Sequence, residues 1–187
     1  MSKDAIVVLT QDHREVEQLF VLAESAFADP VRLKELTDQV TVELVRHSVA
    51  EEELLYPFAK EHLPGGALMV AASLGDHATF ERMLKELEGM RGDSVEFGRT
   101  LRSLMTEVRA HVLEEEGELF PLLTLEATRE ELRELGEQLT RARHMAPTRP
   151  HPLVPDTLPR NTVPAPGPGL VDRLRDTLSG RAGTPWH

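Results

Sequence analysis

The stretch from His47 to Pro57 returns almost unchanged between His111 and Pro121. Each copy reads His-x-x-x-Glu-Glu and ends in an aromatic residue followed by proline. The copies lie 64 residues apart, and the same offset carries the Asp-His pair at 12–13 onto the Asp-His pair at 76–77. Each half of the chain therefore holds one histidine and, 34 residues later, a His-x-x-x-Glu motif.

The spacing within each motif is that of metal ligands on a helix. His47 precedes Glu51 by four residues, and His111 precedes Glu115 by four. Side chains four residues apart on a helix share one face, about one turn from each other. Two symmetrical copies of an imidazole and a carboxylate at this spacing predict two metal ions.

Apolar residues recur at intervals of three and four through four segments, at about 3–28, 30–62, 67–90 and 94–123. This periodicity is typical of amphipathic helices in a bundle. A Leu-Pro-Gly-Gly loop separates the second segment from the third, and we expect a kink or an end at Pro57, because proline lacks an amide proton. The pattern predicts an all-α, antiparallel up-down four-helix bundle. The candidate ligands on its inward faces are His13, His47, Glu51, His77, His111 and Glu115.

The end of the chain predicts a fifth helix and a tail. Thr128 and Glu131 form a capping-box pattern that opens a charged helix to about residue 143, expected to cover one flank of the bundle. We therefore place a bundle domain at 1–144 and a proline-rich, flexible tail at 145–187. A short amphipathic helix within the tail is an alternative, as is docking of a protein partner there.

The composition limits the chemistry. The chain has no cysteine, which excludes disulfides and thiolate ligands and leaves imidazole, carboxylate and phenol. Its formal charge of −11 argues against nucleic acid as a partner. The first residues do not resemble a signal peptide, and no long apolar run occurs. We expect a cytoplasmic protein without membrane contact.

Acidic and aromatic neighbours of the motifs have two interpretations each. Glu52, Glu53 and Glu116 are predicted to point away from the ligand face as a solvated acidic surface; the alternative is that one of them orients a ligand. Tyr56 corresponds to Phe120 in the other copy. On an ideal helix the Tyr56 side chain points away from the ligands and packs against its neighbours. The alternative is that a kink turns its phenol toward the metals. Four further histidines have no counterpart in the repeat: His62, His144, His151 and His187. Of these, His62 is expected to contact a helix end.

The duplicated motifs resemble those of bacterial hemerythrin-like proteins, the His-His-Glu cation-binding family, over residues 5 to 124. The resemblance implies a centre of two iron ions that meets small ligands such as hydrogen peroxide, O2 or NO. It also implies the role of each candidate: His13 and His47 on one iron, His77 and His111 on the other, and Glu51 and Glu115 as bridges.

Two departures from the oxygen-carrying members bear on function. Ser73 stands where those proteins place a further histidine, and Glu115 replaces an aspartate that lies one residue later. The iron at His77 and His111 should therefore be more open, which makes simple oxygen carriage less expected. We predict a peroxide-reactive protein with catalase-like or peroxidase-like turnover in oxidative-stress defence. The alternative is a protein that binds or senses O2, NO or iron without turnover.

Overall fold

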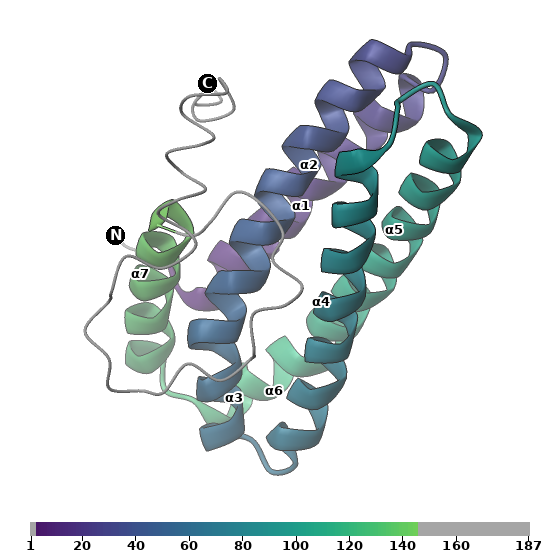
Figure 1. The fold of residues 1–187 in the computed structure, drawn as a ribbon. Helices are drawn as coiled ribbons and strands as arrows, with labels where there is room; N and C mark the ends of the chain where they lie inside the picture. Colours follow the sequence, from purple (N-terminus) through teal and green to yellow (C-terminus); the bar gives the residue numbers. More distant parts are fainter. Residues whose placement is uncertain (1–2, 146–187) are drawn as a thin grey trace, which may run out of the picture.

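The computed structural model describes residues 3–145 (Figure 1). Within this range every regular element is helical, which confirms the predicted all-α class. Two of the elements, η1 and η2, are single π-helical turns. The elements in chain order are α1 (Ala5–Ser25), α2 (Pro30–Ala50), η1 (Glu51–Leu55), α3 (Tyr56–His62), α4 (Gly66–Gly89), α5 (Val95–Glu114), η2 (Glu115–Leu119), α6 (Phe120–Glu126) and α7 (Arg129–Met145).

The four long helices α1, α2, α4 and α5 form the bundle (Figure 1), with α1 packed against α2 and α4 against α5. Side chains of Asp4, Asp29 and Ser94 accept hydrogen bonds from backbone N–H groups in the first turns of α1, α2 and α5. These caps satisfy donors that a helix start leaves unpaired. Two apolar cores lie inside the bundle, and the candidate ligands are found between them.

Each repeat contains a π-helical turn that the periodicity did not predict. The N–H of Tyr56 donates to the carbonyl of Glu51, five residues back, and Phe120 does the same to Glu115. Each irregularity therefore lies just before the proline and not at it, and the helix continues past Pro57. Proline has no N–H to give to the preceding turn, so widening that turn costs one fewer α-helical bond.

The inserted residue changes which side chains face inward. After η2, Leu122 is 39% exposed and Leu123 is fully buried, whereas an uninterrupted helix would turn Leu122 to the same face as Glu115 and Leu119. One extra residue rotates the later positions by about 100°. The same rotation acts on Tyr56, which is 1% exposed.

Helix α7 packs against α1 and α2, covering one flank of the bundle as predicted (Figure 1). The capping box is confirmed: the N–H of Thr128 donates to Glu131 Oε2 at 2.8 Å. At Gly136 a Cβ would lie 2.4 Å from the carbonyl oxygen of Lys3, so only glycine permits this close crossing. The predicted tail at 145–187 lies outside the described residues except for Met145, which ends α7, and so does the alternative of a short helix within it. Among those described, no helix is both long and apolar enough to cross a membrane.

Candidate metal centre

All six candidate ligands predicted from the sequence meet in the middle of the bundle. Each long helix supplies one histidine, and the π-helical turns η1 and η2 supply the two glutamates. Glu51 is 0% exposed and Glu115 is 1% exposed. The donor atoms of the six candidate ligands fall into two overlapping groups, one of four residues and one of three. The groups are His13, His47, Glu51 and Glu115, and Glu51, His77 and His111.

The two carboxylates reach both groups. Glu51 Oε2 lies 3.1 Å from His47 Nε2 and 3.4 Å from His77 Nε2. Each carboxylate oxygen of Glu115 lies near a different histidine: Oε2 is 3.4 Å from His13 Nε2, and Oε1 is 3.6 Å from His111 Nε2. This arrangement suits two carboxylates that each serve a pair of cations.

The separations fit neighbouring ligands of one metal ion. Two ligand atoms bound at 2.0–2.2 Å and about 90–110° apart lie roughly 3.0–3.5 Å from each other. The donor-atom pairs described above lie 3.1 to 3.6 Å apart, close to this range. Three atoms of these side chains also have no hydrogen-bond partner despite being buried: His13 Nε2, Glu51 Oε1 and Glu115 Oε2. Buried polar atoms without partners are rare, and a cation would satisfy these.

Carboxylates face the outer ring nitrogens of all four histidines. His77 Nδ1 lies 2.9 Å from Glu52 Oε1, and His13 Nδ1 lies 2.8 Å from Glu116 Oε1. Glu52 and Glu116 therefore contact ligand histidines, as the alternative interpretation had it, although Glu116 is also exposed; Glu53 is exposed as predicted. The π-helical turns displace both glutamates from their ideal positions. Each bond joins one repeat to the other, and such contacts hold a ligating imidazole in one orientation.

Asp12 and Asp76 complete this outer layer, and sequence analysis missed them. Asp76 Oδ2 lies 3.3 Å from His111 Nδ1, and Asp12 Oδ2 lies 3.9 Å from His47 Nδ1. The signal was available in the repeated Asp-His pair. The copies differ in their surroundings, because Arg143 of α7 forms an ion pair with buried Asp12, whereas the Asp76 side chain is 42% exposed. Helix α7 thus makes the centre asymmetric.

Tyr56 adds a phenol to the second group only. Its hydroxyl lies 3.0 Å from His77 Nε2, 3.1 Å from Glu115 Oε1 and 3.4 Å from Glu51 Oε2. The preferred expectation, that Tyr56 points away from the ligands and only packs, was wrong; the alternative describes the structure, with η1 as the irregularity that turns the phenol inward. This side of the centre is therefore less open than the absence of a histidine at Ser73 predicted. Phe120, its counterpart, stacks on His13 with 5.7 Å between ring centroids.

Of the remaining histidines, His62 has described side-chain contacts. Its Nδ1 lies 2.9 Å from the carbonyl oxygen of Phe58 in the last turn of α3, which confirms the predicted contact with a helix end. Its Nε2 lies 3.6 Å from Glu131 of α7. His151 and His187 fall outside the described residues.

Protons compensate the buried negative charge when no metal is bound. Burial alone would lower the pKa of His47, but the charges of Glu51 and Asp12 raise it to about 10. Burial likewise opposes protonation of His77, yet hydrogen bonds with Glu51 and Glu52 raise its pKa to about 9. Burial would raise the pKa of Glu51, but His47 and His77 hold it well below its usual value. Two imidazolium groups thus face an ionised carboxylate.

Metal binding must displace these protons. We expect loading with divalent ions at pH 7 to release about two protons per chain, from His47 and His77, because imidazole binds metal only when neutral. Titration calorimetry in buffers of different ionisation enthalpy measures this number. Metal affinity should fall as the pH is lowered from 9 to 6, and a proton release close to zero at pH 7 would contradict the prediction.

The same groups set how the stability of the metal-free protein depends on pH. Both folded-state pKa values are raised above the ordinary value of 6.5, so the stabilisation is complete below that pH. It is lost as the pH rises through about 9 and 10. The melting temperature of the metal-free protein should therefore fall between pH 7 and pH 10, by more than that of the metal-loaded protein.

Taken together, the fold and the site define a helical cation-binding protein whose bundle core presents imidazoles and carboxylates from a duplicated motif. Residues 4–123 match the family model of the hemerythrin HHE cation-binding domain. The match spans more than half of the chain, so the protein belongs to the hemerythrin HHE cation-binding family. This confirms the family resemblance carried by the motifs.

Individual proteins are also similar to this chain. The chain is 29% identical over 169 residues to an uncharacterized hemerythrin-like protein of Schizosaccharomyces pombe, covering 90% of this chain and 83% of that one. It is 29% identical over 113 residues to a DNA nickase of a Nostoc species, covering 60% of this chain but 31% of the nickase. A solved structure of a hemerythrin HHE cation-binding domain-containing protein from Mycobacterium kansasii is similar in fold, with a TM-score of 0.64 and 24% identity over 76% of this chain and 86% of that one.

Proposed function

We propose that the protein holds two iron ions at the six-residue centre and reacts with hydrogen peroxide, as a catalase-like or peroxidase-like enzyme. The observation that supports this most is the pair of buried carboxylates, each in contact with histidines of both groups. Imidazole and carboxylate donors without thiolate suit iron. A pair of iron ions held there would supply the two electrons that peroxide takes up, or accept the two that it gives.

The chain's own residues would position the reaction and control protons. His13 and His47 would serve one ion and His77 and His111 the other. Their outer carboxylates keep each ring oriented. The phenol of Tyr56 is buried and lies between two acidic groups, and burial first, then Glu51 and Glu115, raise its pKa well above the usual value. It therefore keeps its proton near the ligands in the metal-free protein. The two apolar cores that flank the centre reduce its contact with bulk water.

Oxygen evolution tests the proposal. The iron-loaded protein should convert excess hydrogen peroxide to O2 and water over many equivalents, recorded with an oxygen electrode. The substitution His47→Ala should reduce this rate by at least about 100-fold, since removing a ligand disturbs both the ion and the shared Glu51. His62→Ala is the matched control, because His62 lies at a helix end, and it should keep the rate.

An iron-loaded protein that consumes no peroxide would contradict this function. So would a variant at His47 that binds the full metal load and retains full activity. Metal analysis and an absorption spectrum on the same samples separate loss of metal from loss of reactivity.

A second candidate is a sensor that binds O2, NO or iron without turnover. The contact that favours it runs from Arg143 in α7 to Asp12, which faces His47. A change at the centre would reach the fifth helix through these residues. A sensor should bind ligand once per site and change its oligomeric state or partner affinity, whereas an enzyme should turn over many equivalents after residues 146–187 are deleted.

A further inference from the structure

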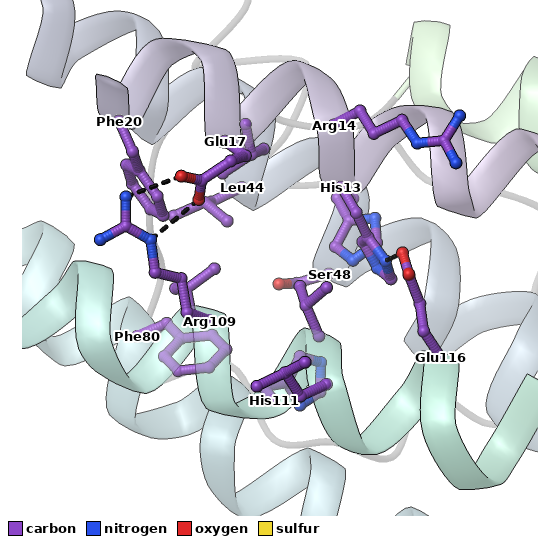
Figure 2. A pocket seen from close by; sticks show the side chains of 15 residues that line it. His13, Arg14, Glu17, Phe20, Leu44, Ser48, Phe80, Arg109, His111 and Glu116 are labelled. Atoms are coloured by element: carbon purple, nitrogen blue, oxygen red, sulfur yellow. Dashed lines mark hydrogen bonds and ion pairs between the residues drawn. The ribbon is translucent and has the colours of Figure 1, made fainter. Parts of the chain in front are cut away.

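A cavity of about 390 Å³ adjoins the centre (Figure 2). Most of its lining comes from α1 and α5, and three proposed ligands border it: His13, His47 and His111. Across it, Arg109 on α5 forms an ion pair with Glu17 on α1, and Glu116 bonds to His13 (Figure 2). The cavity is thus a passage from the surface to the first group of ligands.

The cavity is larger than peroxide or O2 requires. An apolar cavity of about 150 Å³ suffices for benzene, and a water molecule occupies about 30 Å³ of liquid. Pockets that bind small organic molecules begin at about 300 Å³. The volume therefore fits a molecule with a hydrocarbon group of roughly six to ten carbon atoms.

The lining favours a neutral, mainly apolar molecule. Its walls include Val16, Phe20, Leu44, Phe80 and Val108, all buried apolar side chains. Near the ligand histidines lies the half-buried hydroxyl of Ser48, whereas the paired Arg109 and Glu17 lie beside Phe20, away from His13 (Figure 2). An apolar molecule with one polar end matches this distribution.

Charges at the rim offer no strong attraction to an ion. Arg109 donates two hydrogen bonds to Glu17, at 2.9 and 2.7 Å, and one to Glu24 at 2.9 Å. Its charge is therefore compensated. Arg14 is exposed, and Figure 2 shows its guanidinium group extending away from Ser48, where water screens it.

We propose that this cavity binds the hydrocarbon part of a neutral organic hydroperoxide, with the O–O group at the end bordered by His13, His47 and His111. The inference rests on the proposed function and names a substrate class for the same centre. Reduction of ROOH breaks the O–O bond and yields ROH and water. It consumes two protons from water and two electrons, which a reduced iron pair held by the six proposed ligands would supply.

Binding can be tested apart from reaction. Cumyl alcohol, the unreactive reduced form of cumene hydroperoxide, should bind the iron-loaded wild-type protein saturably at one site, measured by titration calorimetry. Val112→Phe places a ring in the cavity and should weaken this binding at least about tenfold, since packed cavities do not accept extra volume. Val95→Phe, the same change at an exposed position of α5, should not.

Absence of saturable binding to the wild-type protein would overturn the inference without any variant. Equal binding by Val112→Phe, with unchanged metal content and circular dichroism, would also overturn it. If Val112→Phe does not fold, Ser48→Leu fills the same cavity from α2 and should weaken binding similarly.

Kinetics separate this inference from the proposed function. In single-turnover reactions of protein whose iron pair has been reduced beforehand, the ratio of the rate with cumene hydroperoxide to the rate with hydrogen peroxide should fall at least about tenfold in Val112→Phe relative to Val95→Phe. Consumption of hydrogen peroxide without binding of cumyl alcohol would overturn the cavity inference and leave the function standing. Binding of the alcohol without consumption of either peroxide would overturn the function, and with it the hydroperoxide as the occupant.

Discussion

Replacement of Glu51 by alanine is expected to abolish metal binding at both positions of the proposed two-ion centre. Glu51 is fully buried, and its Oε2 lies within 3.4 Å of His47 and of His77, which belong to different groups. Its removal takes a negative charge from both positions at once and leaves imidazoles that prefer protons to a weakly held cation. Metal analysis after dialysis should give less than about a tenth of the wild-type content, because loss of ligands and their supports lowers affinity steeply.

The matched control is Glu53→Ala, which removes an exposed carboxylate from the same π-helical turn. It should keep the full metal content and the rise in melting temperature that ligand binding to the native state produces. Retention of one tightly bound ion by Glu51→Ala would contradict the shared role of Glu51 and would indicate two independent sites.

Removal of one oxygen atom, by Tyr56→Phe, is expected to change the reactivity of the second group. The hydroxyl lies within 3.4 Å of three polar ligand atoms, so its oxygen is placed to bind an ion held by His77 and His111. Its loss makes this copy resemble the first, where Phe120 stands. We expect loss of visible absorption from phenolate bound to ferric iron. We also expect faster consumption of peroxide, by about tenfold, equivalent to roughly 1.4 kcal/mol in the barrier.

The reciprocal variant Phe120→Tyr supplies the comparison, because it adds a hydroxyl beside His13, on which Phe120 stacks. An unchanged spectrum and rate in Tyr56→Phe would mean that the hydroxyl forms hydrogen bonds only. Metal content must be equal in all samples, so that reactivity per ion is compared.

Much of the fold followed from local patterns. The intervals of three and four, the capping box at Thr128 and the Leu-Pro-Gly-Gly loop placed the helices within a few residues of their observed ends. Such signals depend on neighbours in the chain, which a sequence displays directly. The π-helical turns were not predicted, because the cost of a widened turn is offset by contacts with other helices.

The outer layer of the centre likewise depends on contacts between helices that the sequence pattern of one helix does not reveal. Glu52 and Glu116 each bond to a histidine of the opposite repeat, across the bundle. Spacing within one helix carries no information about that partner. The role of Asp12 depends in addition on Arg143 of α7, which is distant from Asp12 in the sequence but forms an ion pair with it in the structure.

The duplicated His-x-x-x-Glu motif, with its preceding histidine, determined by itself which six residues are brought together. Their spacing fixes the face of each helix, and apolar periodicity turns that face inward. Tertiary structure decided the rest: Tyr56 belongs to the centre, Glu52 and Glu116 orient the rings, and α7 makes two nearly identical halves unequal. The physical reason is that a one-residue π insertion rotates all later positions of its helix by about 100°, and packing between distant helices determines whether that insertion is stable.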